Sequence, residues 1–200
     1  ARMGMLLAFL AYLLILSGVL GGAHLAMDAT AGERERQSLE PLLATPASRA
    51  AIMSGKLAAA SAFALVMLAI TMVTFKLGFE LLPSDKIGFE CDLSWLAVGK
   101  SFAIRGPMVL FGSALLTALS ATAKSYKEAQ SYMTVLMLLP MVPTIILMVS
   151  PVKTQLWMLT IPFLAQNQMI TKVVRAETID PLQWAVAIGA ALGVALLVWL

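Results

Sequence analysis

The residues of this chain most able to make specific polar contacts gather in one short segment, numbered 30–49. Thr30 and Glu33 have the separation of a capping box, which predicts that a helix begins there. Thr45 followed by Pro46 predicts a second helix start, which leads into the next apolar stretch. The first helix combines charges of both signs with leucines on one face, so it is suited to docking against a partner protein. The residues expected to make that contact are Glu33, Arg34, Glu35, Arg36, Leu39, Glu40, Leu42 and Leu43.

An amphipathic helix lying on the lipid surface is the alternative interpretation of this segment. Such helices carry a mainly basic polar face and a long apolar face. Here the charges are mixed and the apolar face is short, and Pro41 is expected to bend or end the helix. Docking against a protein is therefore the favoured interpretation.

Residues for catalysis or metal binding are missing from the sequence. Gly55-Lys56 lacks the preceding glycine-rich loop of a nucleotide-binding P-loop, so the chain is not expected to hydrolyse ATP itself. His24 is the single histidine, and one histidine cannot build a metal site. No acidic residue lies in the middle of an apolar stretch, which disfavours an intramembrane enzyme. We expect no catalytic residue, no metal and no cofactor bound by this chain.

The elements that position the charged segment are membrane-spanning helices. The chain is 60% hydrophobic and 12% charged, with a mean hydropathy of +0.88, whereas soluble domains carry about 25% charged residues. Its apolar residues form stretches long enough to cross a bilayer, and such stretches must be helical to satisfy their backbone groups. The predicted fold is all-α, a polytopic integral membrane helix bundle forming one transmembrane permease domain over residues 1–200. Its five predicted spans are 3–27, 57–75, 102–122, 132–149 and 182–200.

The connecting segments alternate between the two sides of the membrane. Segments 28–56 and 123–131 are predicted on one side, and segments 76–101 and 150–181 on the other. Lysine and arginine are divided between both sides, with Arg105 counted near the second surface, so the positive-inside rule does not orient the chain. The charged residues of the second loop on the first side are Lys124, Lys127 and Glu128.

Small residues and prolines mark positions inside the spans. Gly18 and Gly22, like Gly189 and Gly193, have the G-x-x-x-G spacing that lets helices approach closely. Segment 132–149 contains Pro140 and Pro143, which predict a kinked or broken helix because proline removes a backbone donor. Broken helices line pathways in transporters, and kinks also serve packing alone. Both interpretations stay open.

The charged segment resembles the signature of ABC-2 type permeases, and among them the NatB-like sodium-exporter permeases. The matching run is Gly32-Glu33-Arg34-Glu35-Arg36, Leu39-Glu40, Leu42-Leu43, Thr45-Pro46, Ser48-Arg49 and Gly55-Lys56. Residues 123–130 resemble the short second cytoplasmic loop of that family. Ile161-Pro162-Phe163 and Gln166-Asn167-Gln168 resemble its extracytoplasmic connection before the last helix.

This resemblance implies a membrane permease subunit of an ATP-binding-cassette exporter. Segment 30–56 would then be the cytoplasmic coupling segment that meets a separate ATPase subunit, present in two copies and carrying ATP and Mg. It also implies a second permease copy, a location in the bacterial or archaeal inner membrane, and a first helix with a large extracytoplasmic domain before Ala1. The lipid bilayer is the other expected partner, and the dispersed net charge of +3 gives no reason to expect nucleic acid.

The function classes that compete with an exporter permease are an intramembrane enzyme and a secondary transporter or channel. Ion-coupled transport usually needs carboxylates at mid-membrane, and the spans of this chain lack them. The transported substrate stays open among sodium, lipid, drug and peptide.

Overall fold

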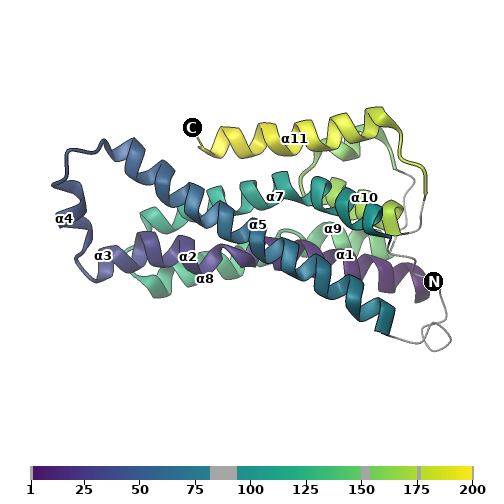
Figure 1. The fold of residues 1–200 in the computed structure, drawn as a ribbon, viewed down its shortest axis with the longest axis horizontal. Coiled ribbons are helices and arrows are strands. Elements are labelled where there is room, and N and C mark those ends of the chain that lie inside the picture. The colour runs from purple at the N-terminus through teal and green to yellow at the C-terminus, as the bar shows by residue number, and fades with distance from the viewer. Residues whose placement is uncertain (1, 82–93, 150–153, 175–176, 200) are drawn as a thin grey trace.

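The computed structural model shows long helices running side by side, with one short helix projecting at one end (Figure 1). The structure describes residues 2–81, 94–149, 154–174 and 177–199. In chain order these ranges contain α1 (Arg2–Gly21), α2 (Ala23–Met27), the π-helical turn η1 (Asp28–Gly32), α3 (Glu33–Glu35), α4 (Leu39–Leu43), α5 (Arg49–Leu81), α7 (Trp95–Thr122), α8 (Tyr126–Leu138), α9 (Met141–Val149), the 3-10 turn η2 (Leu156–Thr160), α10 (Leu164–Val174) and α11 (Pro181–Trp199). No strand occurs in these ranges, so the predicted all-α fold is confirmed.

Five helical stretches of the described residues are long and apolar enough to span a membrane. They are Ala11–Glu35, Arg49–Gly78, Trp95–Thr122, Tyr126–Leu147 and Pro181–Trp199. Their number and order are those of the predicted spans, but the helices extend beyond the apolar residues at several ends. The chain is therefore a multi-pass helical membrane protein.

The first span does not end at Met27. It continues through the π-helical turn η1 into α3 and ends near Glu35. Thr30 lies inside this helix, and its hydroxyl donates to the Ala26 carbonyl oxygen at 2.7 Å. The predicted capping box at Thr30 is wrong, because the preceding helical turn already supplies partners for the backbone donors that a cap would satisfy.

The second predicted helix start is shifted by three residues. Helix α5 begins at Arg49 rather than Pro46, and the Ser48 hydroxyl accepts a hydrogen bond from the Ala51 amide at 3.2 Å. The Thr45 hydroxyl instead donates to the Leu42 carbonyl at 2.7 Å. The 33 residues of α5 extend about 50 Å. From Arg49 onward α5 runs without a break through the second span, but residues 44–48 separate it from α4.

The helix break predicted at the two prolines is present. Helix α8 ends at Leu138 and α9 begins at Met141, because Pro140 has no amide hydrogen to continue the helical ladder. The Thr144 hydroxyl donates to the Pro140 carbonyl oxygen at 2.8 Å, one turn back along the chain.

Part of segment 150–181 folds back into the bundle instead of remaining a connection on the far side. Helix α10 packs against α1 and α7, and η2 packs against α11. Asn167 is 1% exposed and donates to the Thr144 hydroxyl at 2.9 Å. The interpretation of 161–168 as an external connection is therefore corrected. Residues 150–153 and 175–176 of this segment, and 82–93 of the other loop on that side, lie outside the described residues.

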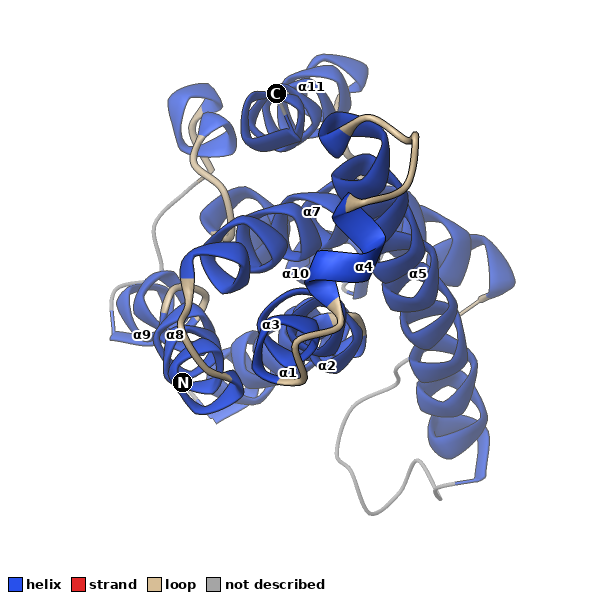
Figure 2. Cartoon of the chain, turned by 90° about the vertical axis from the view of Figure 1, so that its left-hand side faces the viewer, coloured by secondary structure: helices blue, strands red, loops and turns tan. Residues whose placement is uncertain are grey.

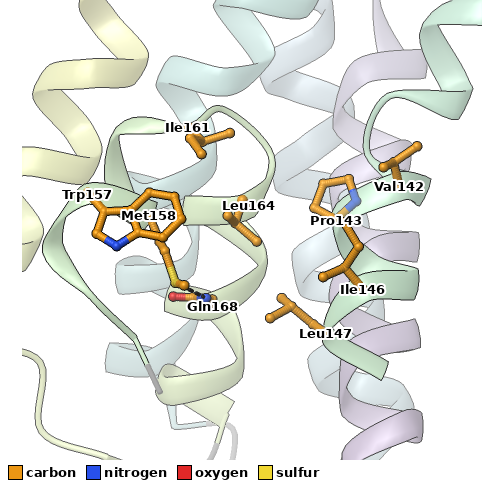
Figure 3. Close-up of a pocket in the computed structure, with 9 residues that line it drawn as sticks. All are labelled: Val142, Pro143, Ile146, Leu147, Trp157, Met158, Ile161, Leu164 and Gln168. Atoms are coloured by element: carbon orange, nitrogen blue, oxygen red, sulfur yellow. Dashed lines mark hydrogen bonds between the residues drawn. The ribbon is translucent and has the colours of Figure 1, made fainter. Parts of the chain in front are cut away.

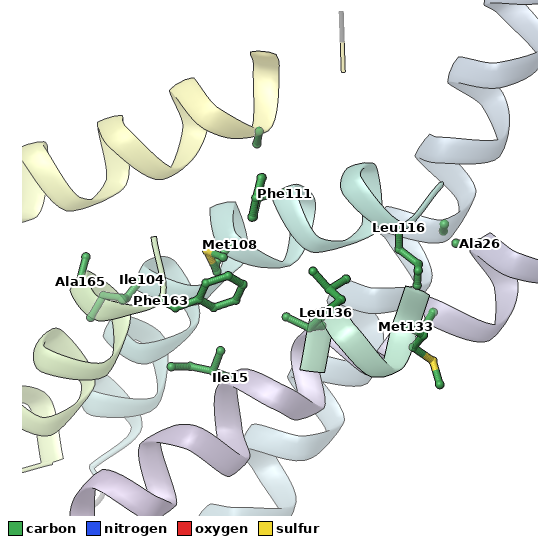
Figure 4. Close-up of a cluster of buried hydrophobic side chains, with 14 of the residues drawn as sticks. Ile15, Ala26, Ile104, Met108, Phe111, Leu116, Met133, Leu136, Phe163 and Ala165 are labelled. Atoms are coloured by element: carbon green, nitrogen blue, oxygen red, sulfur yellow. The ribbon is translucent and has the colours of Figure 1, made fainter. Parts of the chain in front are cut away.

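Helix α7 is the centre of the bundle, and the main apolar core forms around it (Figure 4). Phe111 of α7 meets Phe163, just before α10, edge to face with ring centroids 6.2 Å apart. Ile15 of α1 and Leu136 of α8 belong to the same buried cluster. The core therefore joins the folded-back segment to the spanning helices.

Arg105 was predicted to lie near the membrane surface, but it lies inside α7. Its side chain is 2% exposed, its Nη1 contacts the sulfur of Met72 on α5, and its Nε has no hydrogen-bond partner in the described structure. Arg105 was grouped with the charges of the loop before this span because the predicted span began at residue 102. Helix α7 begins at Trp95, seven residues earlier. Arg105 is thus a buried charge among spanning helices.

The first of the two G-x-x-x-G pairs packs closely, and the second does not. A Cβ added at Gly22 would lie 2.5 Å from the Ala60 carbonyl oxygen of α5, and one at Gly18 would lie 2.7 Å from a methyl of Val109. At Gly189 and Gly193 an added Cβ would meet nothing within 4 Å. Of the two G-x-x-x-G pairs, the one in the first span therefore serves close packing inside this chain.

Gly22→Ala is expected to destabilise the protein by about 1–3 kcal/mol, because the backbone of α5 must move away. Gly55→Ala, in α5 and facing open space, is expected to be neutral or to stabilise by up to about 1 kcal/mol. The measurement is the thermal unfolding midpoint of the full-length protein in detergent. Equal midpoints for the two variants would contradict the close α2–α5 contact.

Candidate functional site

The charged residues predicted to contact a partner lie together at one end of the bundle. Helices α3 and α4, the start of α5 and the turn from α7 to α8 meet there, and Figure 2 shows this end facing the viewer. Segments 28–56 and 123–131 therefore lie at the same end of the bundle, as predicted. At this end α3 is held against α5, α7 and α8, whereas α4 projects from the bundle.

Arg34 of α3 holds the end of α7. Its guanidinium donates to the Ala123 carbonyl oxygen at 2.8 Å and to the Ala121 carbonyl oxygen at 2.7 Å. The last carbonyls of a helix have no intrahelical donor and carry the negative end of the helix dipole. The Arg34 guanidinium therefore supplies hydrogen-bond donors to these carbonyls and places a positive charge at the negative end of the helix dipole.

Glu35 makes the complementary contact at the start of α8. Its Oε2 accepts the Tyr126 amide at 2.9 Å, at the positive end of that helix dipole. The Ser125 hydroxyl accepts from the Glu128 amide at 3.3 Å, and Glu128 accepts from the Lys124 amide at 2.8 Å. The α7–α8 turn is thus held from α3 and by its own cap.

Lys56 joins α3 to α5. Its ammonium pairs with the Glu33 carboxylate and donates to the Ala29 carbonyl oxygen at 2.6 Å. The Lys56 side chain is only 11% exposed, so solvent screens this pair less than a surface pair. Together with Arg34 and Glu35, these contacts form a set that we call the α3 brace: Glu33, Arg34, Glu35 and Lys56.

Arg36 pairs with Asp28, about two helical turns back along the same segment. The two charged atoms are 2.8 Å apart, and the side chains are 68% and 48% exposed. Such exposed pairs contribute little to stability. Arg36 is thus near the brace without joining another helix to it.

The chain leaves the bundle directly after the brace. Gln37 has a φ of 57°, in the left-handed region, and the short helix α4 follows. The expected single helix over 33–43 is therefore wrong, and the break lies before Pro41 rather than at it. Pro41 is the third residue of α4, inside the first turn, where its missing amide hydrogen costs no helical bond.

Helix α4 projects beyond the other helices (Figures 1 and 2). Glu40 is exposed and Leu42 is half-buried. Leu39 and Leu43 belong to the same helix, and their side chains lie outside the described residues. At the same end of the bundle, Lys124 and Lys127 are exposed. Among the described side chains, the surface that a partner can reach here includes Glu40, Lys124 and Lys127.

The contacts of the α3 brace hold α3 against α5, α7 and α8 at this end of the bundle. No group of three or more metal-ligating side chains occurs in the described ranges. Of the predicted contact residues, Glu33, Arg34 and Glu35 are engaged inside the chain, whereas Glu40 is exposed. Pro140 and Pro143 belong to the α8–α9 break and are not part of this end.

Two residues of the site were not predicted. Lys56 was interpreted only as part of a helix start, and nothing in the local pattern connects it with Glu33, 23 residues earlier. Ser125 could have been found, because Ser125 and Glu128 have the capping-box spacing that was assigned to Thr30 and Glu33.

Residues 3–200 match the family model described as ABC-2 family transporter protein. The chain is 36% identical over 163 residues to the ABC transporter permease protein NatB of Bacillus subtilis (strain 168), which covers 80% of this chain and 42% of that protein. The chain therefore spans less than half the length of this relative. No solved structure matches the chain significantly.

Arg34→Met is expected to lower the stability of the full-length protein by about 1–2 kcal/mol, because two helix-end carbonyls lose a charged donor. The matched control is Arg36→Met, which removes an exposed pair contributing less than about 1 kcal/mol. Thermal unfolding midpoints in detergent test both variants. A larger loss for Arg36→Met than for Arg34→Met would contradict the assignment of Arg34 to the brace.

Proposed function

The chain belongs to the ABC-2 transporter family, and on that premise we propose that it is the membrane permease subunit of an ATP-binding-cassette exporter. The observation that carries this proposal is the projecting helix α4, whose flanking residues are tied to several spanning helices. A surface arm attached in this way is suited to receive movement from a partner. The permease name of the Bacillus subtilis relative supports the same assignment.

We propose that α4 acts as the coupling element for a separate ATPase subunit. Closure of two ATPase copies around ATP and Mg would push on α4 and its exposed carboxylate, Glu40. The movement would pass to α5 directly, since α5 begins six residues after α4 ends. It would also pass through the α3 brace to α7 and α8. This chain would supply no catalytic residue and bind no cofactor.

We further propose that two permease copies form one pathway in a bacterial or archaeal inner membrane. Within this scheme the break at Pro140 is a candidate for lining the pathway, because broken helices expose backbone groups that a passing substrate can contact. Segments 28–56 and 123–131 would face the cytoplasm, where the ATPase binds.

The brace changes which substitutions can test this proposal. Glu33→Lys and Glu35→Lys would remove contacts inside the chain, so loss of a partner could follow from local unfolding. Glu40 is exposed on the projecting helix and avoids this ambiguity. Glu177 is an exposed carboxylate beside α10 and away from the α4 end, and Glu177→Lys makes the same change of charge.

Glu40→Lys is expected to reduce co-purification of the full-length protein with its ATPase by about tenfold, which corresponds to about 1.4 kcal/mol of binding free energy. Glu177→Lys is expected to leave the complex intact. The measurement is the ratio of ATPase to permease after affinity purification from membranes. Equal loss for both variants would contradict the role of α4, and absence of any ATPase with the unmodified protein would contradict the exporter assignment.

A further inference from the structure

Arg105 interrupts the apolar face with which α7 packs against α5. On this face Val98, Phe102 and Val109 belong to, or pack against, one apolar cluster that also contains residues of α5. Arg105 lies three residues after Phe102 and four before Val109, so its side chain projects from the same face of the helix. Its guanidinium contacts the sulfur of Met72, which is a member of that cluster. A cation thus occupies a position whose neighbours are apolar.

The charge of Arg105 has no counter-charge in the described structure. None of the three ion pairs between described residues includes it, and its Nε has no hydrogen-bond partner there. The side chain is 2% exposed. The cleft between α9 and the η2–α10 segment (Figure 3) and the groove between α5, α7 and α11 are lined by other residues. Neither of these openings brings solvent to the guanidinium in this conformation.

The next turn of α5 adds a second buried cation to the contact between α5 and α7. Lys76 lies four residues after Met72, is 6% exposed and pairs with Glu80. Its ammonium also lies 4.8 Å from the centre of the Trp95 ring, at the start of α7. Like charges repel more strongly among apolar side chains than in water. The carboxylate of Glu80 offsets the charge of Lys76, and the charge of Arg105 remains.

These charges oppose the close contact between α5 and α7. Arginine stays protonated in proteins, and a buried charge without a partner carries a large desolvation cost. A methionine or leucine would fill the same position without that cost. Packing in this conformation therefore does not explain an arginine at position 105.

Helix α7 has a weak point two residues after Arg105. Pro107 lies inside the helix, where it removes one backbone hydrogen bond and favours a bend. The part of α7 before Pro107 carries Trp95, Phe102 and Arg105, which face α5 or its bound ammonium. This part can tilt away from α5 with a smaller loss of hydrogen bonding than an uninterrupted helix.

We propose that α7 bends at Pro107 in a second conformation, in which its contact with α5 opens and Arg105 faces water. The unpaired charge destabilises the closed contact, and hydration of the guanidinium stabilises the open one. Arg105 thereby keeps the two conformations close in free energy, so that a modest input shifts the balance between them. It acts as a positioning residue and not as a catalytic one.

The thermal unfolding midpoint tests the cost of the buried charge. Arg105→Met is expected to raise the midpoint of the full-length protein in detergent by about 2–4 °C. Lys100→Met is the matched control, because Lys100 is an exposed cation of the same helix, and its midpoint is expected to stay unchanged. An unchanged or lower midpoint for Arg105→Met would overturn the proposal, because the guanidinium would then be satisfied elsewhere in the full-length protein.

Thiol accessibility tests the second conformation while Arg105 is retained. Met72→Cys, 3% exposed in the closed contact, is made in a full-length background with Cys91→Ser and with serine at any other cysteine. The protein is reconstituted with its ATPase and treated with the anionic reagent sulfonatoethyl methanethiosulfonate. Modification is expected to be about tenfold faster during ATP hydrolysis than without nucleotide, because its rate follows the population of the open conformation.

Two further variants show whether the opening is local and whether Arg105 controls it. Ile104→Cys, 1% exposed in the main apolar core, is expected to stay unreactive with and without ATP. Adding Arg105→Met to Met72→Cys is expected to reduce the acceleration by ATP. Equal acceleration at positions 72 and 104 would show general loosening of the bundle, and no acceleration at position 72 in a complex that hydrolyses ATP would show that the contact stays closed. Either result would overturn the proposal.

The dependence of the opening on ATP rests on the proposed function. The comparison of unfolding midpoints needs no ATPase, whereas the exporter assignment is tested by co-purification. Failure of that assignment and failure of this inference therefore give different results.

Discussion

The double hydrogen bond from Arg34 to the last carbonyls of α7 is the contact on which the organisation of this end of the bundle depends. Helix α3 has only three residues, too few to be stable by itself. Its position comes from the π-helical turn before it and from the contacts of the α3 brace. Arg34, Glu35 and Lys56 therefore fix the point at which the chain leaves the bundle toward α4.

The number and order of the spanning helices were predictable because their signal is a property of many residues together. A stretch of apolar side chains long enough to cross the membrane must form a helix whatever its neighbours are. The break at Pro140 was predictable for a similar reason, since proline removes a donor in any context. The helix starts at Thr30 and Pro46 were not, because a capping pattern is also compatible with a residue inside a longer helix, as the Thr30 bond to Ala26 shows.

The candidate site was predicted in its location but not in its internal organisation. A run of mixed charges indicates a specific contact without stating whether the partner lies in the same chain. Glu33 and Glu35 find theirs in Lys56 and in the amide of Tyr126, which are distant in sequence. The packing of the folded-back segment was not predicted either, because the polar run Gln166-Asn167-Gln168 is equally typical of an exposed loop. Asn167 donates to Thr144 and Gln166 accepts from the Phe163 amide, which shows how part of this polarity is satisfied inside the bundle.

Helix α8 connects the two regions in which this chain departs from simple spanning helices. Its first amide is bound by Glu35 of the brace, and its other end stops at the break before α9. Its 13 residues make a rod of about 20 Å. Beyond the break, α9 is joined to α10 through the Thr144–Asn167 bond. The break itself, where Pro140 leaves the backbone without a helical hydrogen bond, is therefore the point between the brace and α10 that backbone hydrogen bonds constrain least.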